Sequence, residues 1–100
     1  MHLTNARRVG AMLKITKMEE NGTTVVLKLE GKITEQWAVL LDGECRAFLR
    51  NQKTLLLDCA GVNFLDARGV DVLRDLLLKE VAIIGAPGFV TELLRTGAQS

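Results

Sequence analysis

The alternation of apolar and polar residues predicts two strands joined by a tight turn at the start of the chain. In "MLKITKM", apolar residues alternate with Lys and Thr, which is typical of a strand with one buried face. In "TVVLKLEG", the apolar residues Val25, Leu27 and Leu29 share one face, and Gly31 is expected to end the strand. The intervening Asn21-Gly22 tolerates the positive φ of a type I′ turn. We therefore expect an antiparallel hairpin.

The next segment, "ITEQWAVLLDGECRAFLRNQ", places apolar residues three to four positions apart. This spacing predicts a helix with one apolar face that packs on the core. The face contains Ile33, Trp37, Leu40, Leu41, Cys45, Phe48 and Leu49. Thr34 is expected to cap the helix, because its hydroxyl can accept a free backbone N–H. Gly43 should cost about 1 kcal/mol inside the helix relative to Ala.

Short apolar strands alternate with helices in the second half of the chain. "KTLLLDCAG" is apolar on both faces, which favours a strand covered on both sides. "DARGVDVLRDLLLKE" has helical spacing, "VAIIGA" is a further strand, and "PGFVTELLRTG" is a last helix begun by Pro87 and closed by Gly97. The order β-β-α-β-α-β-α predicts an α/β fold with a mixed sheet of about four strands and three helices. Residues 1–11 are expected to form a flexible N-terminal arm, and residues 12–100 a single domain.

Composition excludes several classes of protein. Thirteen Lys and Arg against twelve Asp and Glu give a net charge of +1, which does not favour a nucleic-acid partner. No apolar stretch is long enough to insert in a membrane and no export signal is visible, so we expect a cytoplasmic protein. The two cysteines are expected to be free thiols. The one histidine, His2, nearly excludes a histidine metal site or a catalytic Ser-His or Cys-His pair.

The remaining candidates for chemistry are two carboxylates and a thiol. Asp58 and Asp66 are expected to flank the third strand-to-helix loop, where paired carboxylates could bind a metal or transfer protons. Because Asp66 precedes a helix, a capping role is favoured. Cys59 has no histidine to activate it and is interpreted as structural. We therefore expect no catalytic residue, metal or cofactor, and a binding or regulatory role; an enzyme or small-molecule site using these three residues is the alternative.

The segment "LLLDCAGVNFLDARGVDVLRDL" resembles the signature of STAS domains, the family of the anti-sigma factor antagonists and of the cytoplasmic tails of sulfate transporters. The family pattern is an apolar strand ending in Asp or Asn, a short loop, an apolar pair, Asp, a Ser or Thr, one more small residue, Gly and an apolar helix. The matching residues are Leu55–Leu57, Asp58, Gly61-Val62, Phe64-Leu65, Asp66, Gly69, Val70 and Leu73. "LKLEGKIT" and "GAPGFVTELLRTG" resemble the second strand and last helix of the family, so the likeness runs from about Leu13 to Gly97.

This resemblance implies a non-catalytic module for bacterial signal transduction that binds a protein partner. In the antagonists, a kinase that is also the anti-sigma factor phosphorylates the Ser or Thr after the loop Asp. Ala67 occupies that position here and Arg68 follows it, while Thr34 stands where many members carry Asp. The implied partner surface comprises Asp58, Asn63, Asp66, Ala67, Arg68 and Gly69, with Thr34 beside it. The implied partner is an anti-sigma factor of the serine-kinase type or, alternatively, the ATPase of a membrane lipid or anion transporter; a homodimer through the first strand is also open.

Overall fold

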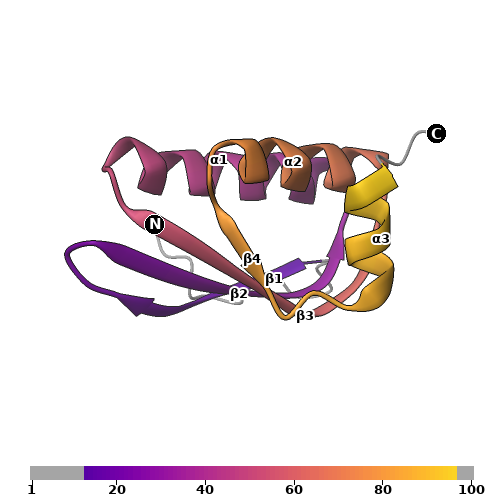
Figure 1. Ribbon diagram of the computed structural model, residues 1–100, viewed down its shortest axis with the longest axis horizontal. Helices are drawn as coiled ribbons and strands as arrows, with labels where there is room; N and C mark the ends of the chain where they lie inside the picture. Colours follow the sequence, from indigo (N-terminus) through magenta and orange to yellow (C-terminus); the bar gives the residue numbers. More distant parts are fainter. Residues whose placement is uncertain (1–12, 97–100) are drawn as a thin grey trace.

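Four strands and three helices make up the described part of the chain, residues 13–96 of a computed structural model (Figure 1). In chain order they are β1 (Leu13–Glu20), β2 (Thr24–Ile33), α1 (Glu35–Arg50), β3 (Thr54–Leu65), α2 (Ala67–Leu78), β4 (Ala82–Ile84) and α3 (Gly88–Thr96). The sheet order is β1-β2-β3-β4, with β1 antiparallel to β2 and the other pairs parallel. The predicted element order and mixed sheet are confirmed. The expected arm over 1–11 and the expected closing role of Gly97 lie outside the described residues.

The turn between β1 and β2 has a different geometry from the predicted type I′ turn. The hairpin is present, but neither Asn21 nor Gly22 has a positive φ. Instead, Oδ1 of Asn21 accepts hydrogen bonds from the backbone N–H groups of Thr23 (2.8 Å) and Thr24 (2.9 Å). A side-chain amide can replace a backbone acceptor in this way, so the chain reverses without a left-handed residue.

The core lies between the sheet and the pair of helices α1 and α2, which contact each other (Figure 1). Alternate residues of the central strands face these helices and are fully buried, among them Val25, Leu27 and Leu57. Within residues 13–96, no helix lies beneath the sheet, and Leu56 on that side is only half-buried. The prediction that the third strand is covered on both faces is therefore wrong; its continuous leucines reflect one packed face and one partly open face.

The apolar face of α1 is narrower than its sequence predicted. Ala38, Leu41 and Cys45 are fully buried, and the partly buried Trp37 packs against them with Phe48 and Leu49. Leu40 is 43% exposed and lies outside the core. Ile33 is buried, but it belongs to β2. The fully buried residues of α1 therefore form one narrow row, with Trp37, Phe48 and Leu49 partly buried beside it.

Strands β2 and β3 both run further than predicted, which determines where the candidate site lies. Gly31 does not end β2: it adopts a φ of 106° within the strand, where the register with β3 shifts, and the strand continues to Ile33. A φ of this sign is readily available only to glycine. Likewise β3 continues to Leu65, so only Asp66 separates it from α2. Because the two strands are parallel, their carboxyl ends deliver α1 and α2 to the same end of the sheet.

Candidate functional site

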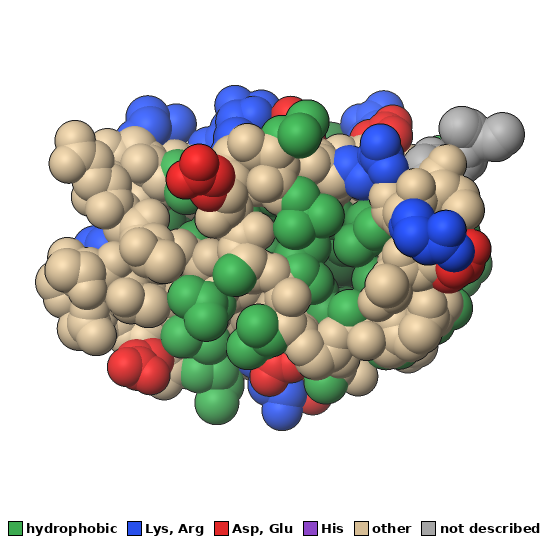
Figure 2. All heavy atoms as spheres, in the orientation of Figure 1, with side chains coloured by type: hydrophobic (Ala, Val, Ile, Leu, Met, Phe, Trp, Pro, Cys, Tyr) green, Lys and Arg blue, Asp and Glu red, His purple; other side chains and the backbone are tan. Residues whose placement is uncertain are grey.

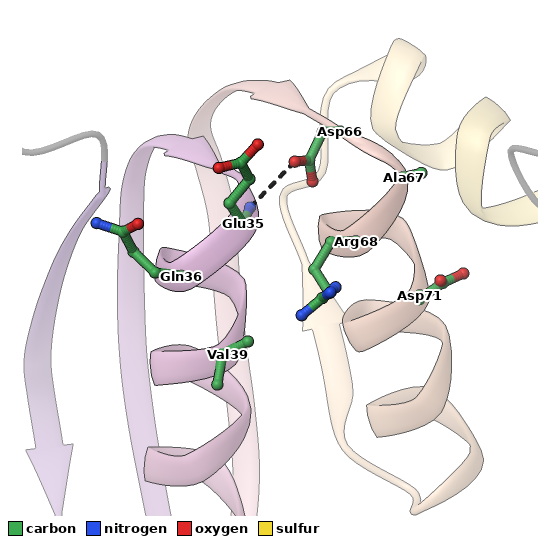
Figure 3. Close-up of a pocket in the computed structure, with 7 residues that line it drawn as sticks. All are labelled: Glu35, Gln36, Val39, Asp66, Ala67, Arg68 and Asp71. Atoms are coloured by element: carbon green, nitrogen blue, oxygen red, sulfur yellow. Dashed lines mark hydrogen bonds between the residues drawn. The ribbon is translucent and has the colours of Figure 1, made fainter.

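The carboxylate of Asp66 joins the first turns of the two helices (Figure 3). Its Oδ1 accepts a hydrogen bond from the backbone N–H of Gly69 at 2.7 Å, which caps α2. Its Oδ2 accepts a hydrogen bond from the backbone N–H of Glu35 at 3.0 Å, in the first turn of α1. Both N–H groups would otherwise lack an acceptor within their helices. The predicted capping role of Asp66 is therefore confirmed, and it extends to a second helix.

The start of α1 depends on this carboxylate and not on Thr34. Thr34 occupies the N-cap position, but its side chain makes no capping hydrogen bond. The prediction that its hydroxyl caps the helix is wrong, because Asp66 from the far end of β3 supplies an acceptor in its place. The next residue, Glu35, has a φ of +42°, which is uncommon for a side chain other than glycine. The hydrogen bond that its N–H donates to Asp66 helps to hold the backbone of Glu35 in this strained conformation.

Gly69 allows the first turn of α2 to approach the end of β2. A Cβ atom on residue 69 would lie 2.1 Å from the carbonyl oxygen of Ile33, a separation that real structures do not show. At the same contact, the N–H of Asp66 donates to the Ile33 carbonyl over 3.4 Å. Asp66 and Gly69, two of the residues that carried the family resemblance, therefore have structural reasons to be where they are.

The two residues between them are presented to solvent. Ala67 and Arg68 are both exposed and line an open groove of about 530 Å³ between the first turns of α1 and α2. The other lining residues are Glu35, Gln36, Val39, Asp66 and Asp71. In Figure 3 the guanidinium of Arg68 lies between the two helices, while Asp71 points away from α1. In Figure 3 the Cβ of Ala67 lies on the same outer side of α2 as Asp71, so Val39 is the apolar side chain on the α1 side of the groove, beside several charged groups.

Four of its lining residues were not among the sequence-based candidates. They are Glu35, Gln36, Val39 and Asp71. All four lie outside the apolar helix faces that the hydrophobic pattern predicted. Only Val39 could have been noticed in the sequence, because it is an apolar residue outside the buried face of α1. In the structure it is 52% exposed. That α1 and α2 lie side by side could not be predicted from the spacing of residues in the sequence.

Asp58, Asn63 and Cys59 lie elsewhere. Asp58 is inside β3, where its Oδ1 accepts from the N–H of Ala60 at 3.0 Å, so it does not flank a loop as predicted. Seven residues of the strand lie between it and Asp66, a distance on the order of 25 Å. Asn63 is exposed near the end of β3, at a shift in the register with β2. Neither residue lines the groove, and the proposed three-residue site of Asp58, Cys59 and Asp66 is not assembled.

Both cysteines are core residues. Cys45 and Cys59 are fully buried and unpaired, as the interpretation of free structural thiols predicted. Burial raises the pKa of each thiol to about 12, and nearby carboxylates add to the shift. A thiol that stays protonated at neutral pH is a poor nucleophile. Among residues 13–96, no group of three or more His, Cys, Asp or Glu side chains is arranged to hold a metal ion.

Ion pairs connect α1 and α2 further from the groove. Arg46 donates to Asp42 at 2.9 Å on its own helix and to Asp75 on α2 at 3.3 Å. The hydrogen bond and charge of Asp42 raise the pKa of Arg46, and Lys79, with Arg46, lowers the pKa of Asp75. These groups are exposed, so water and salt screen the pairs. The pair of Arg46 and Asp75 links the two helices at a second place, in addition to the hydrogen bonds of Asp66.

A second surface with exposed apolar side chains lies on the side of β4. Figure 2 shows hydrophobic side chains gathered over the centre of this face, around a hollow between β4 and α3. The exposed large apolar residues of the elements concerned are Leu77, Leu78, Ile84 and Phe89. This surface is separate from the residues that line the groove, so it provides an internal comparison for any test of where a partner binds.

Comparison with known proteins agrees with the fold and with the sequence motif. The family model described as "Mlab, STAS domain" matches residues 16–98. A solved structure of the anti-sigma factor antagonist SpoIIAA in its unphosphorylated form superimposes with a TM-score of 0.61 at 15% identity, covering 83% of each chain. No curated protein sequence matches. No helix in the described range is both long and apolar enough to cross a membrane. Since the family model spans most of the sequence and the expected β-β-α-β-α-β-α order is present, the chain belongs to the STAS domain family.

Proposed function

We propose that this chain is a non-catalytic regulatory module, resembling an anti-sigma factor antagonist, that binds a protein partner at the groove between α1 and α2. The observation that supports it is the division of roles within the family motif. Asp66 and Gly69 are used inside the fold, whereas Ala67 and Arg68 face solvent beside the groove. Residues that are exposed on a rigid base of this kind are suited to recognition.

Ala67 removes the usual switch from this surface. A phosphate would add about −1.5 to −2 charges next to the groove and would change what can bind there. Alanine has no hydroxyl to accept a phosphate, so the proposed module stays in one binding state as far as position 67 is concerned. Restoring the hydroxyl with Ala67→Ser tests this point: a partner kinase with labelled ATP should label the variant at residue 67 and leave the natural chain unlabelled there.

The binding surface itself is tested by capture from native lysate with two charge substitutions. Ala67→Glu places a carboxylate at the groove, and a glutamate in the first turn of a helix favours folding. Ile84→Glu places the same group on the β4 surface. The captured partner should be lost with Ala67→Glu and retained with Ile84→Glu. Loss with Ile84→Glu alone would move the interface to the β4 surface and refute the proposal.

A second candidate function is a subunit that partners the ATPase of a membrane transporter, a role in which STAS domains also occur. The observation in its favour is again Ala67, because a permanently bound subunit needs no phosphorylated residue. The identity of the captured protein separates the two functions. A kinase-like anti-sigma factor supports the first, and a transporter ATPase supports the second.

A further inference from the structure

The groove between α1 and α2 has an acidic lining. Three of its seven lining residues are carboxylates, Glu35, Asp66 and Asp71, against one cation, Arg68. Asp66 counts among the charges, because accepting backbone N–H groups does not neutralise a carboxylate. The N-terminus of each helix contributes about +0.5 charge, so the two together offset about one carboxylate. The excess of negative charge in the groove is therefore reduced but not removed.

Two of these carboxylates lie at one end of the groove, at the first turn of α1. The hydrogen bond between the N–H of Glu35 and Oδ2 of Asp66 holds the two residues together. In Figure 3 their carboxylates lie at the same end of the groove, whereas the guanidinium of Arg68 lies further along the helices. Among residues 13–96, neither carboxylate has a cation within ion-pair distance. Other unpaired carboxylates, such as that of Glu80, do not line the groove.

The chain enters the fold at the end of the sheet that carries this pair of carboxylates. Leu13, the first residue of β1, pairs with Gly31, and two residues further along β2 the carbonyl of Ile33 accepts the N–H of Asp66. The start of β1 therefore lies about 7 Å along the sheet and about 5 Å across it from Ile33. Residues 1–12, "MHLTNARRVGAM", precede this point and lie outside the described structure.

We propose that residues 1–12 bind in the groove through Arg7 and Arg8, which contact the carboxylates of Glu35 and Asp66. The segment has two arginines and no Asp or Glu, so its charge is opposite to that of the lining. A planar guanidinium matches a carboxylate with two parallel hydrogen bonds. The inference rests on the proposed function, because it makes this segment a competitor of the partner for the same surface.

The segment has the reach for this contact and is tethered beside it. Arg8 is five residues before Leu13, and five extended residues span about 16 Å, which exceeds the separation between the start of β1 and Ile33. Exposed ion pairs are individually weak, so the same peptide free in solution should bind poorly. Attachment to β1 makes the contact intramolecular, with an effective concentration on the order of millimolar. A weak contact can then occupy the groove for much of the time.

NMR spectroscopy of the full chain tests the contact. Arg7→Ala/Arg8→Ala should shift the backbone amide signals of Glu35 and Gly69, whose N–H groups are bound by Asp66. It should leave the amide signal of Ile84, on the β4 surface, unchanged. Circular dichroism of every variant confirms that it is folded.

A charge control and a spin label separate direct contact from a general effect of charge. Lys28→Ala/Arg50→Ala removes two positive charges that lie away from the groove, on β2 and in the last turn of α1, and should not shift the two groove signals. A spin label on Asn5→Cys should broaden the groove signals more than those of the β4 surface. The natural cysteines, Cys45 and Cys59, are buried and stay unlabelled.

Binding of the native partner tests the competition. Arg7→Ala/Arg8→Ala should lower the Kd of the captured partner about 3- to 10-fold, because the competing segment is released. An unchanged or higher Kd would refute the competition, and a higher value would show that the segment contacts the partner instead. Groove signals that do not shift, or that shift equally in the charge control, would overturn the inference even where Ala67→Glu abolishes partner binding and the proposed function stands. If the partner stays bound to Ala67→Glu, the proposed function fails, while the NMR signals still decide whether the segment binds the groove.

Discussion

Replacing Gly69 by alanine should destabilise the protein far more than a helix substitution of this size normally does. The added Cβ would lie 2.1 Å from the carbonyl oxygen of Ile33, so the first turn of α2 and the end of β2 must separate by about 1 Å. Overpacking of this kind costs about 1–3 kcal/mol. The separation also breaks the weak Asp66 N–H to Ile33 hydrogen bond and stretches the 3.0 Å bond to Glu35, at about 0.5–1.5 kcal/mol each. The better helix propensity of alanine returns about 1 kcal/mol.

The net loss is about 1–5 kcal/mol, out of a total stability of about 5–15 kcal/mol for a small domain. Urea denaturation followed by circular dichroism measures it, and with a slope of about 1–3 kcal/mol per molar the midpoint should fall by roughly 1–2 M. Gly43→Ala is the matched control, because Gly43 lies inside α1 with nothing within 4 Å of the added atom. It should raise stability by up to about 1 kcal/mol. If Gly69→Ala raised the urea midpoint as Gly43→Ala does, the inference that Gly69 is needed for the close approach of α2 to β2 would be wrong.

Three further predictions concern other parts of the chain. Asp66→Ala leaves two backbone N–H groups without an acceptor and should lower the free energy of unfolding by about 1–3 kcal/mol, with Asp66→Asn less harmful because its amide oxygen still caps one helix; equal losses would contradict this. Cys45 and Cys59 should resist a thiol reagent at pH 8 until the protein is unfolded, and, because their pKa is raised to about 12 only in the folded state, stability should fall as pH rises from about 9 toward 12; a constant stability over this range would refute the assignment. In the hairpin, Asn21→Ala should lower the free energy of unfolding by about 0.5–1.5 kcal/mol in a thermal or urea melt. Gly22→Ala should change it by less than about 0.5 kcal/mol, since Gly22 has no positive φ. A larger loss for Gly22→Ala than for Asn21→Ala would indicate a type I′ turn instead.

The sequence predicted the order of elements well because that order depends on local periodicity. Strands with alternating burial, such as the one containing Val25 and Leu27, and the helical spacing around Leu73 and Leu76 are visible in a window of a few residues. The ends of the strands were predicted less well. Gly31 was expected to end β2, yet pairing with β3 carries the strand on to Ile33. Such pairing is a contact between distant segments, which local pattern does not contain.

The candidate site was predictable only where the motif is contiguous. Asp66 was identified as a helix cap from the residues that follow it, and the structure confirms that role. Its second hydrogen bond, to Glu35, joins residues 31 positions apart and could not be inferred from spacing. For the same reason Thr34 was assigned a cap that Asp66 provides. Val39 entered the groove only because the two parallel strands bring α1 beside α2.

The double role of Asp66 has an evolutionary consequence. One carboxylate fixes the first turns of two helices, so a change at residue 66 disturbs folding and the shape of the groove together. Residues 67 and 68 take no part in those bonds and face solvent. Under the proposed function, mutations there would change the surface offered to a partner, or add a hydroxyl that a kinase could phosphorylate, while both hydrogen bonds of Asp66 stay in place. If these two residues contact the partner, as proposed, a lineage of such domains would diversify its partners through two adjacent codons while the scaffold around them stays the same.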